Sequence, residues 1–307
     1  MKSKKYLGAS LCLLAAVVWG FGFVAQDMGA EHVGPFTFQA ARTIVAALAL
    51  ALLWVGRDLF RRKRGTYQKM SAADKKWMLI GGLVCGLVLC AATNFQQFGI
   101  SSNESSPGKD AFITALYIVL VPLIGLVLGK RAKWHVYVCV VIAVIGLWML
   151  CMGGSSLSLG DLMLIVCSFI FAMHITVVDH FSPRVDGIRL SCIMFLTVAV
   201  ISTVLAFVME DPQWAGIGKA MGAILYSGGV SAAVGYTLQI LGQKHTPPTV
   251  ASLLMSLESV FAVIASAILL PEISSFSARE WIGMLVILLA IILSQLDLDF
   301  KKKEKTE

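Results

Sequence analysis

Glu258, Arg42 and His174 are ionisable residues that each lie inside a long apolar segment of this 307-residue chain. Placing a charged side chain at the centre of a bilayer costs about 2.5–3.5 kcal/mol on insertion scales, so such residues usually face a protein interior or a wet cavity. There, Glu258 could bind a cation or carry a proton, and Arg42 could bind an anion. The alternatives are structural. Glu258 and His174 could form hydrogen bonds between helices, and the Arg42 side chain could snorkel toward the membrane surface or pair with a structural carboxylate.

Further polar and aromatic side chains recur at spacings of three and four residues, which places each set on one face of a helix. The sets are Trp19, Phe23 and Gln26; Cys90, Asn94, Gln97 and Ser101; Asp110, Thr114 and Tyr117; and Tyr236, Gln239 and Gln243. Aromatic faces supply apolar contact area to a ligand, and amides fix its orientation. Hydrogen bonding between helices is the alternative interpretation of every set.

These observations predict a binding site for a small molecule near the middle of the membrane. Its predicted lining is Trp19, Asn94, Gln97, Tyr117, His174, Gln239 and Glu258. Arg42, Lys109 and Asp110 are candidates for a charged contact or a gate. We expect no catalytic residue, cofactor or metal, because the chain has no CxxC motif and its five histidines fall in separate segments.

The composition indicates which solvent surrounds the elements that carry these residues. Hydrophobic residues make up 58% of the chain and charged residues only 14%, and the mean hydropathy is +0.82. Ordinary soluble proteins are about 25% charged. The net charge of +7 is distributed in short clusters between apolar segments, which is typical of membrane proteins and does not indicate nucleic-acid binding.

Ten segments are each long enough to cross a bilayer as a helix, which takes roughly 20 apolar residues. They are 7–26, 36–56, 77–99, 110–129, 134–152, 161–179, 190–209, 219–241, 249–270 and 280–296. If both termini are cytoplasmic, 21 of the 25 lysines and arginines fall on the cytoplasmic side. Since positive charge accumulates on that side, we predict an all-α protein of the cell's inner membrane with this orientation.

The chain also repeats itself. Residues 77–150 align with 221–296 in a register that pairs Gln96 with Gln239 and Tyr117 with Glu258. We therefore predict two five-helix repeats, at 7–152 and 161–297. Because five is odd, the second repeat enters the membrane in the opposite sense, which is typical of secondary transporters.

Three segments carry a resemblance to a known family. They are AAVVWGFGFV at 15–24, SPGKDAFITALYIVLVPLIG at 106–125 and LLMSLESVFAVIASAILLPE at 253–272. With these segments the chain resembles the EamA family of the drug/metabolite transporter superfamily. It departs from the family pattern at Ser259, where a proline usually follows the Leu-Glu pair, and at Pro271, which precedes the closing glutamate in place of the commoner glycine.

The resemblance implies a secondary transporter that moves an amino acid, amine or similar metabolite by alternating access, with export as the expected direction. The expected partners are this substrate, the lipid bilayer and a proton as candidate coupling ion, in a monomer or homodimer. A membrane channel is the alternative. An intramembrane enzyme is disfavoured because the GxSxG and HExxH motifs are absent.

Overall fold

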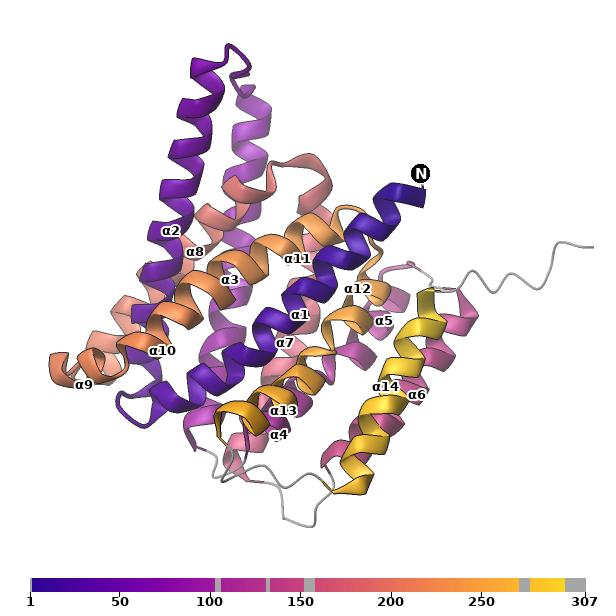
Figure 1. Cartoon of the computed structure of the whole chain (residues 1–307). Helices are drawn as coiled ribbons and strands as arrows, with labels where there is room; N and C mark the ends of the chain where they lie inside the picture. The colour runs from indigo at the N-terminus through magenta and orange to yellow at the C-terminus, as the bar shows by residue number, and fades with distance from the viewer. Residues whose placement is uncertain (1, 103–105, 131–132, 152–157, 271–276, 296–307) are drawn as a thin grey trace, which may run out of the picture.

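The structure is a computed structural model that describes residues 2–102, 106–130, 133–151, 158–270 and 277–295. Within these ranges the regular elements are all helical (Figure 1). They are α1 (Lys2–Ala30), α2 (Pro35–Lys63), α3 (Ala72–Ser102), α4 (Pro107–Thr114), α5 (Tyr117–Val127), α6 (Trp134–Cys151), α7 (Leu159–Phe181), η1 (Ser182–Arg184), α8 (Gly187–Met209), α9 (Trp214–Lys219), α10 (Met221–Leu225), η2 (Tyr226–Gly235), α11 (Tyr236–Gln243), α12 (Pro248–Met255), α13 (Glu258–Leu269) and α14 (Ala278–Gln295).

Eight described helical stretches are long and apolar enough to cross a membrane, and they coincide with eight of the ten predicted segments. The other two predicted segments coincide with shorter apolar helices, Trp134–Gly146 and Trp281–Ala290. The predicted ends at 152, 296 and 297 and the basic cluster at 301–305 lie outside the described residues.

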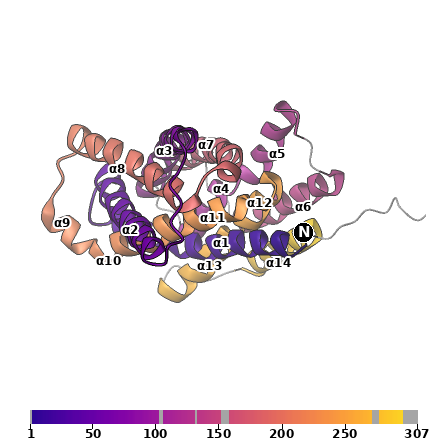
Figure 2. The ribbon, with the colours of Figure 1, turned by 90° about the horizontal axis from the view of Figure 1, so that it is seen from above.

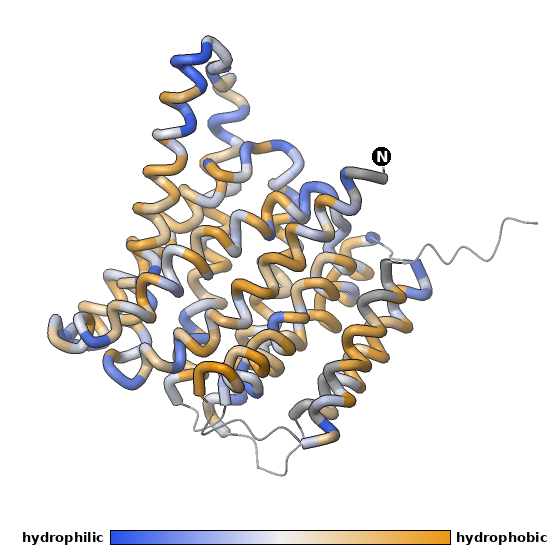
Figure 3. Tube along the Cα trace, in the orientation of Figure 1, coloured by the Kyte–Doolittle hydropathy of each residue, from blue (hydrophilic) through white to orange (hydrophobic). Residues whose placement is uncertain are grey.

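The outer surface of the helices is apolar. Leu52, Val127 and Val200 are 75%, 88% and 64% exposed, whereas Gln39 and Gln97 are completely buried. Hydrophilic residues gather at the helix ends, most clearly at the tip where α2 leads into α3 (Figure 3). A surface more apolar than parts of the interior suits a lipid solvent, and the helices satisfy their backbone groups internally, as lipid requires.

Two of the crossing helices are interrupted in the middle. The chain between α4 and α5 tightens at Leu116, whose N–H donates to the carbonyl of Ile113 at 3.2 Å. Leu257, between α12 and α13, likewise donates to Leu254 at 3.4 Å. These are bonds to the third residue back, as in a 3₁₀ turn. The two interruptions fall at the positions that the internal repeat aligns.

A third crossing helix changes its winding. Between α10 and α11 the chain forms ten residues of π-helix, η2, with the glycine-rich sequence YSGGVSAAVG. Gly235 permits a close approach there, because a Cβ on it would lie 2.5 Å from Nε1 of Trp19 in α1. π-helical turns are rare and are frequently found at functional sites.

The helices pack so that the irregular segments lie in the interior. α1 contacts η2 and α11 on one side and α12 and α13 on another, while α4 and α5 contact α7. α2 packs along α8, and α3 packs on both α7 and α8. α6 and α14 pack against each other at one edge of the molecule (Figure 2). The interrupted helices and the π-helical segment η2 therefore surround the centre of the molecule.

Candidate functional site

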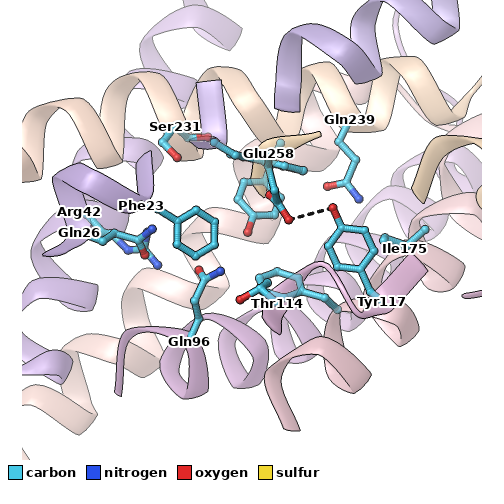
Figure 4. Close-up of a pocket in the computed structure, with 13 residues that line it drawn as sticks. Phe23, Gln26, Arg42, Gln96, Thr114, Tyr117, Ile175, Ser231, Gln239 and Glu258 are labelled. Atoms are coloured by element: carbon cyan, nitrogen blue, oxygen red, sulfur yellow. Dashed lines mark hydrogen bonds between the residues drawn. The ribbon is translucent and has the colours of Figure 1, made fainter. Parts of the chain in front are cut away.

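A cavity lies where the interrupted helices meet (Figure 4). Its lining is Trp19, Phe23, Gln26, Arg42, Gln96, Thr114, Tyr117, Phe171, Ile175, Ser231, Tyr236, Gln239 and Glu258. Its volume is about 30 Å³, which has room for water but not for a metabolite. Pockets that hold small molecules measure about 300–1,000 Å³. The structure is therefore closed around the cavity, and a larger ligand requires the helices to move apart.

A hydrogen bond joins the two interrupted helices across the cavity. The hydroxyl of Tyr117 donates to Oε1 of Glu258 at 2.9 Å (Figure 4). Tyr117 is the first residue of α5 and Glu258 the first of α13, so each side chain follows directly on an interruption. Both are buried, at 3% and 4% exposure. The carboxyl of Glu258 thus has a neutral partner and lies at the positive end of a helix dipole.

A second buried charge belongs to Arg42 of α2. Its Nε donates to Oε1 of Gln39 at 2.6 Å, and the Gln39 amide donates in turn to the hydroxyl of Thr93 in α3 at 2.5 Å. The side chain is only 5% exposed. Nη2 is buried without a hydrogen-bond partner, and no carboxylate lies within ion-pairing distance among the described residues. Neutral groups therefore orient the guanidinium without neutralising it.

Amide oxygens add free acceptors to this lining. Gln239 donates through its amide nitrogen to Gln243 at 2.9 Å, and Gln26 donates to the carbonyl of Gly22 at 3.2 Å. The Oε1 atoms of Gln239 and Gln26 are buried and lack a hydrogen-bond partner. Buried polar atoms are normally paired, so each is available to a ligand donor or a water molecule.

Aromatic rings cover the wall formed by α1 and the second half of the chain. The Trp19 and Tyr236 rings lie 4.9 Å apart, and Nε1 of Trp19 donates to the carbonyl of Ser231 at 3.1 Å. Phe23, one helical turn beyond Trp19, also faces the cavity. The lining as a whole combines apolar rings, amides and two opposite charges, which is the chemistry of a binding site for a small polar solute.

The structure brings together part of the predicted site. Trp19, Tyr117, Gln239, Glu258 and Arg42 all line the cavity. Lining residues outside the predicted set are Phe23, Gln26, Gln96, Thr114, Phe171, Ile175, Ser231 and Tyr236. The polar stripes and the repeat register already contained Phe23, Gln26, Gln96, Thr114 and Tyr236. Phe171 and Ile175 are apolar residues of α7 and gave no signal in the sequence.

Asn94, Gln97 and His174 do not line this cavity. The Asn94 amide donates to the carbonyl of Cys90 in its own helix at 2.7 Å. Gln97 donates to the backbone of Gln26 at 3.4 Å. His174 is completely buried, with its ring edge-on to Tyr236 at 5.9 Å. Asn94 and Gln97 therefore make contacts within or between helices, and His174 lies behind an aromatic residue of the lining.

The candidate gate residues lie at the start of α4. Lys109 forms an ion pair with Asp161 of α7, with Nζ 3.0 Å from Oδ2. Asp161 also belongs to the capping box that begins α7 with Ser158. The adjacent Asp110 is completely buried. Lys109 thus joins α4 to α7 outside the cavity.

Comparisons with known proteins agree on a family. The profile of the EamA-like transporter family matches this chain twice, over residues 6–152 and 158–296. An uncharacterized transporter of Archaeoglobus fulgidus is 25% identical over 95% of this chain and 87% of its own length. The uncharacterized transporter YwfM of Bacillus subtilis is 24% identical over 91% of this chain and 90% of its own length.

A solved structure supports the fold. A protein crystal structure aligns with 94% of this chain and covers 98% of its own, with a TM-score of 0.72 and 16% sequence identity. At that identity the likeness shows a shared fold and nothing about the solute.

Proposed function

This chain belongs to the EamA-like transporter family and is a multi-pass membrane transporter, and we propose that it moves a small metabolite across the cytoplasmic membrane by alternating access. Export is the proposed direction, and a proton is the proposed coupling ion. The proposed architecture is ten crossing helices in two inverted repeats, at 7–152 and 161–297, with both termini in the cytoplasm.

The observation that carries the proposal is the shared cavity. Seven of its lining residues come from the first proposed repeat and six from the second. The Tyr117–Glu258 hydrogen bond joins the two repeats at aligned positions, each directly after a helix interruption. Broken helices at corresponding positions of two halves are the best indication of a transporter's binding site.

The closed cavity implies how the cycle would run. Because its volume is about 30 Å³, a metabolite can enter only if the two halves separate on one side. Closing that side and opening the other would carry the solute across, as rocking of two halves does in secondary transporters. Glu258 is the group that would accept a coupling proton, since its carboxyl lies in the cavity with a neutral hydrogen-bond partner.

Flux measurements test the proposal. The purified chain in proteoliposomes is offered a panel of amino acids, amines, sugars and nucleosides, in both directions. A transporter gives saturable flux of at least one solute. Flux that rises without saturation and follows the voltage would instead indicate the channel, and no flux of any solute would contradict both.

The Glu258→Gln variant tests the mechanism. It keeps the shape of the side chain but cannot ionise, so we expect it to lose transport, or the dependence of transport on pH between about pH 5 and about pH 8. Glu31→Gln is the matched control, because Glu31 is exposed beyond α1. A folded Glu258→Gln protein that transports normally at every pH would show that Glu258 is structural.

A further inference from the structure

The cavity contains two ionisable groups, one acidic and one basic, that form no ion pair. Glu258 has the Tyr117 hydroxyl as its partner, and Arg42 has the Gln39 amide. Neither lies within ion-pairing distance of the other or of any charged group among the described residues. A buried charge without a counter-ion is costly, so a ligand that neutralises it gains binding energy.

The two charges lie at different ends of the cavity. In the close-up, Arg42 lies beside Gln26, whereas Glu258 lies beside Tyr117 and Gln239, and the ring of Phe23 lies between the two groups (Figure 4). A ligand that reaches both ends must therefore carry separated charges.

The classes of solute differ in whether they would neutralise Arg42, Glu258 or both. An amine would pair with Glu258 and leave Arg42 without a counter-ion, and a carboxylic acid would do the reverse. A sugar would neutralise neither group. A zwitterion neutralises both at once, and its carbon skeleton would contact the rings of Phe23, Trp19 and Tyr236, which lie along the same lining.

We propose that the transported solute is a zwitterion, with its carboxylate against Arg42, its ammonium against Glu258 and its apolar skeleton against the aromatic rings of the lining. This inference rests on the function proposed above. Arg42 is suited to the carboxylate because its guanidinium presents parallel N–H donors that match two carboxylate oxygens. The Gln39–Thr93 pair holds the guanidinium in place through Nε, which leaves Nη2 free for the ligand.

Calorimetric titration of the purified full chain tests the proposal with three matched series. The zwitterions are phenylalanine and leucine, in which one carbon carries both charged groups, and 6-aminohexanoate, in which five carbons separate them. Each is compared with the corresponding amine (2-phenylethylamine, 3-methylbutylamine, pentylamine) and the corresponding acid (3-phenylpropanoate, 4-methylpentanoate, hexanoate). We expect at least one zwitterion to bind about tenfold or more tightly than both of its singly charged analogues, because a site built for a polar group rejects a ligand that lacks it.

Two variants that each remove one ionisable group test which charged group of the ligand binds Arg42 and which binds Glu258. In Arg42→Gln the affinity for the zwitterion should exceed that for the amine by no more than about threefold, while the zwitterion still binds more tightly than the acid. In Glu258→Gln the affinity advantage over the acid should be the one that is lost, and the advantage over the amine should remain. Arg42→Lys keeps the positive charge and should keep both preferences. Arg62→Gln and Glu31→Gln change exposed residues outside the cavity and should change neither preference. If Arg42→Gln does not fold, the affinities of the wild-type protein and of Arg42→Lys for the three series still test the zwitterion proposal.

The outcomes separate this inference from the proposed function. If an amine or an acid binds as tightly as every zwitterion, or if both variants weaken all probes equally, the zwitterion inference is wrong. If no zwitterion binds but the flux panel yields another saturable solute, the transporter proposal stands and this inference fails. If the panel yields no flux, the transporter proposal itself fails.

Discussion

At the scale of single residues, the hydrogen bond between the side chains of Tyr117 and Glu258 joins the two halves of the chain in the closed cavity. We predict that Tyr117→Phe lowers kcat/KM for the transported solute by about tenfold or more, because a hydrogen bond to a charged group contributes about 1.5–3 kcal/mol. Initial rates in proteoliposomes measure the effect.

The matched control for that substitution is Tyr226→Phe. Tyr226 donates to the backbone carbonyl of Val18 at 3.2 Å and does not line the cavity. It should therefore leave transport close to the wild-type rate. Equal losses in the two variants would mean that the Tyr117 hydroxyl acts on folding and not on the cavity.

The sequence predicts single residues well where burial is most costly. Glu258 and Arg42 stood out because charge is expensive in lipid, and both line the cavity. Polar stripes are a weaker guide, because a stripe fixes the face of a helix but not how far that helix is rotated toward the centre. Asn94 and Gln97 share a stripe, yet both amides bond to nearby helix backbone.

At the scale of elements, charged side chains join α2 to α8 at both ends, through ion pairs at one end and hydrogen bonds at the other. At one end Arg189 pairs with Asp58 at 2.7 Å and Arg57 pairs with Asp186 at 2.8 Å. At the other end both carboxylate oxygens of Glu210, which follows α8, accept backbone N–H groups at the start of α2. We infer that α2 and α8 move as one unit during transport.

The contacts of Asp186 also affect the pKa of its carboxyl. Partial burial alone would raise the pKa of this carboxyl. The hydrogen bond from Arg57, the N–H of Arg189 and the charges of both arginines outweigh burial and hold the pKa below its ordinary value. The carboxylate form of Asp186 therefore holds the start of α8 to α2.

Two ion pairs of different exposure give a prediction about stability. Breaking a buried pair costs about 3–5 kcal/mol, because it leaves a buried charge alone, whereas exposed pairs contribute about 1 kcal/mol or less. We therefore expect Asp58→Asn, which leaves Arg189 at 7% side-chain exposure, to lower the melting temperature in detergent clearly. Lys130→Gln, which breaks an exposed pair with Asp179, should barely change it. Similar shifts in both variants would contradict the fastening of α2 to α8.

Close helix contacts depend on particular glycines. The sequence offers three pairs with GxxxG spacing, at 82/86, 125/129 and 218/222. Only the first lies in a tight interface, because a Cβ on Gly86 would lie 2.6 Å from Thr197 and 2.8 Å from the carbonyl of Met194. A Cβ on Gly222 would meet nothing within 4 Å.

These distances predict opposite effects of alanine. Gly86→Ala should lower the melting temperature, since α3 and α8 must move apart. Gly222→Ala should leave it unchanged or raise it, because alanine favours a helix over glycine by about 1 kcal/mol. Thermal unfolding of both variants in the same detergent measures the difference, and a stable Gly86→Ala protein would show that this interface yields easily.

The sequence did not reveal the helix interruptions. No glycine or proline stands at residues 115–116 or 256–257, where the helices break, so local propensity gives no sign of them. What marks these places is the repeat register, in which Tyr117 aligns with Glu258. The interruptions depend on packing against the opposite half, which a single segment does not encode.

At the scale of the whole molecule, length and composition carried most of the prediction. Apolar segments of about 20 residues predict membrane helices because lipid cannot satisfy backbone polar groups, and eight of the ten predicted segments meet that criterion in the structure. The resemblance to the EamA family, and thus to the drug/metabolite transporter superfamily, is confirmed by the double family match. The solute is not predictable this way, because one fold serves many solutes.

Orientation in the membrane remains a prediction, and the structure sharpens its test. Glu31 and Gln213 belong to the same end of the molecule, since a Cβ on Gly216 would lie 2.5 Å from the carbonyl of His32 and one on Gly34 would lie 2.5 Å from Glu210. Arg62 lies near the far end of α2. All three side chains are exposed, so each accepts a cysteine without disturbing the packing.

We predict that a membrane-impermeant maleimide added to intact cells labels Glu31→Cys and Gln213→Cys but labels Arg62→Cys only after the cells are opened. The physical reason is the asymmetry of positive charge, with 21 lysines and arginines on the side of Arg62 and three at the opposite ends. Native background should be low, because the six cysteines whose burial the structure describes are all buried. Labelling of Arg62→Cys in intact cells, with Glu31→Cys protected, would reverse the orientation and with it the proposed direction of transport. Labelling of Glu31→Cys but not of Gln213→Cys would instead show that the two loops lie on different sides, which would contradict the packing of the helix ends itself.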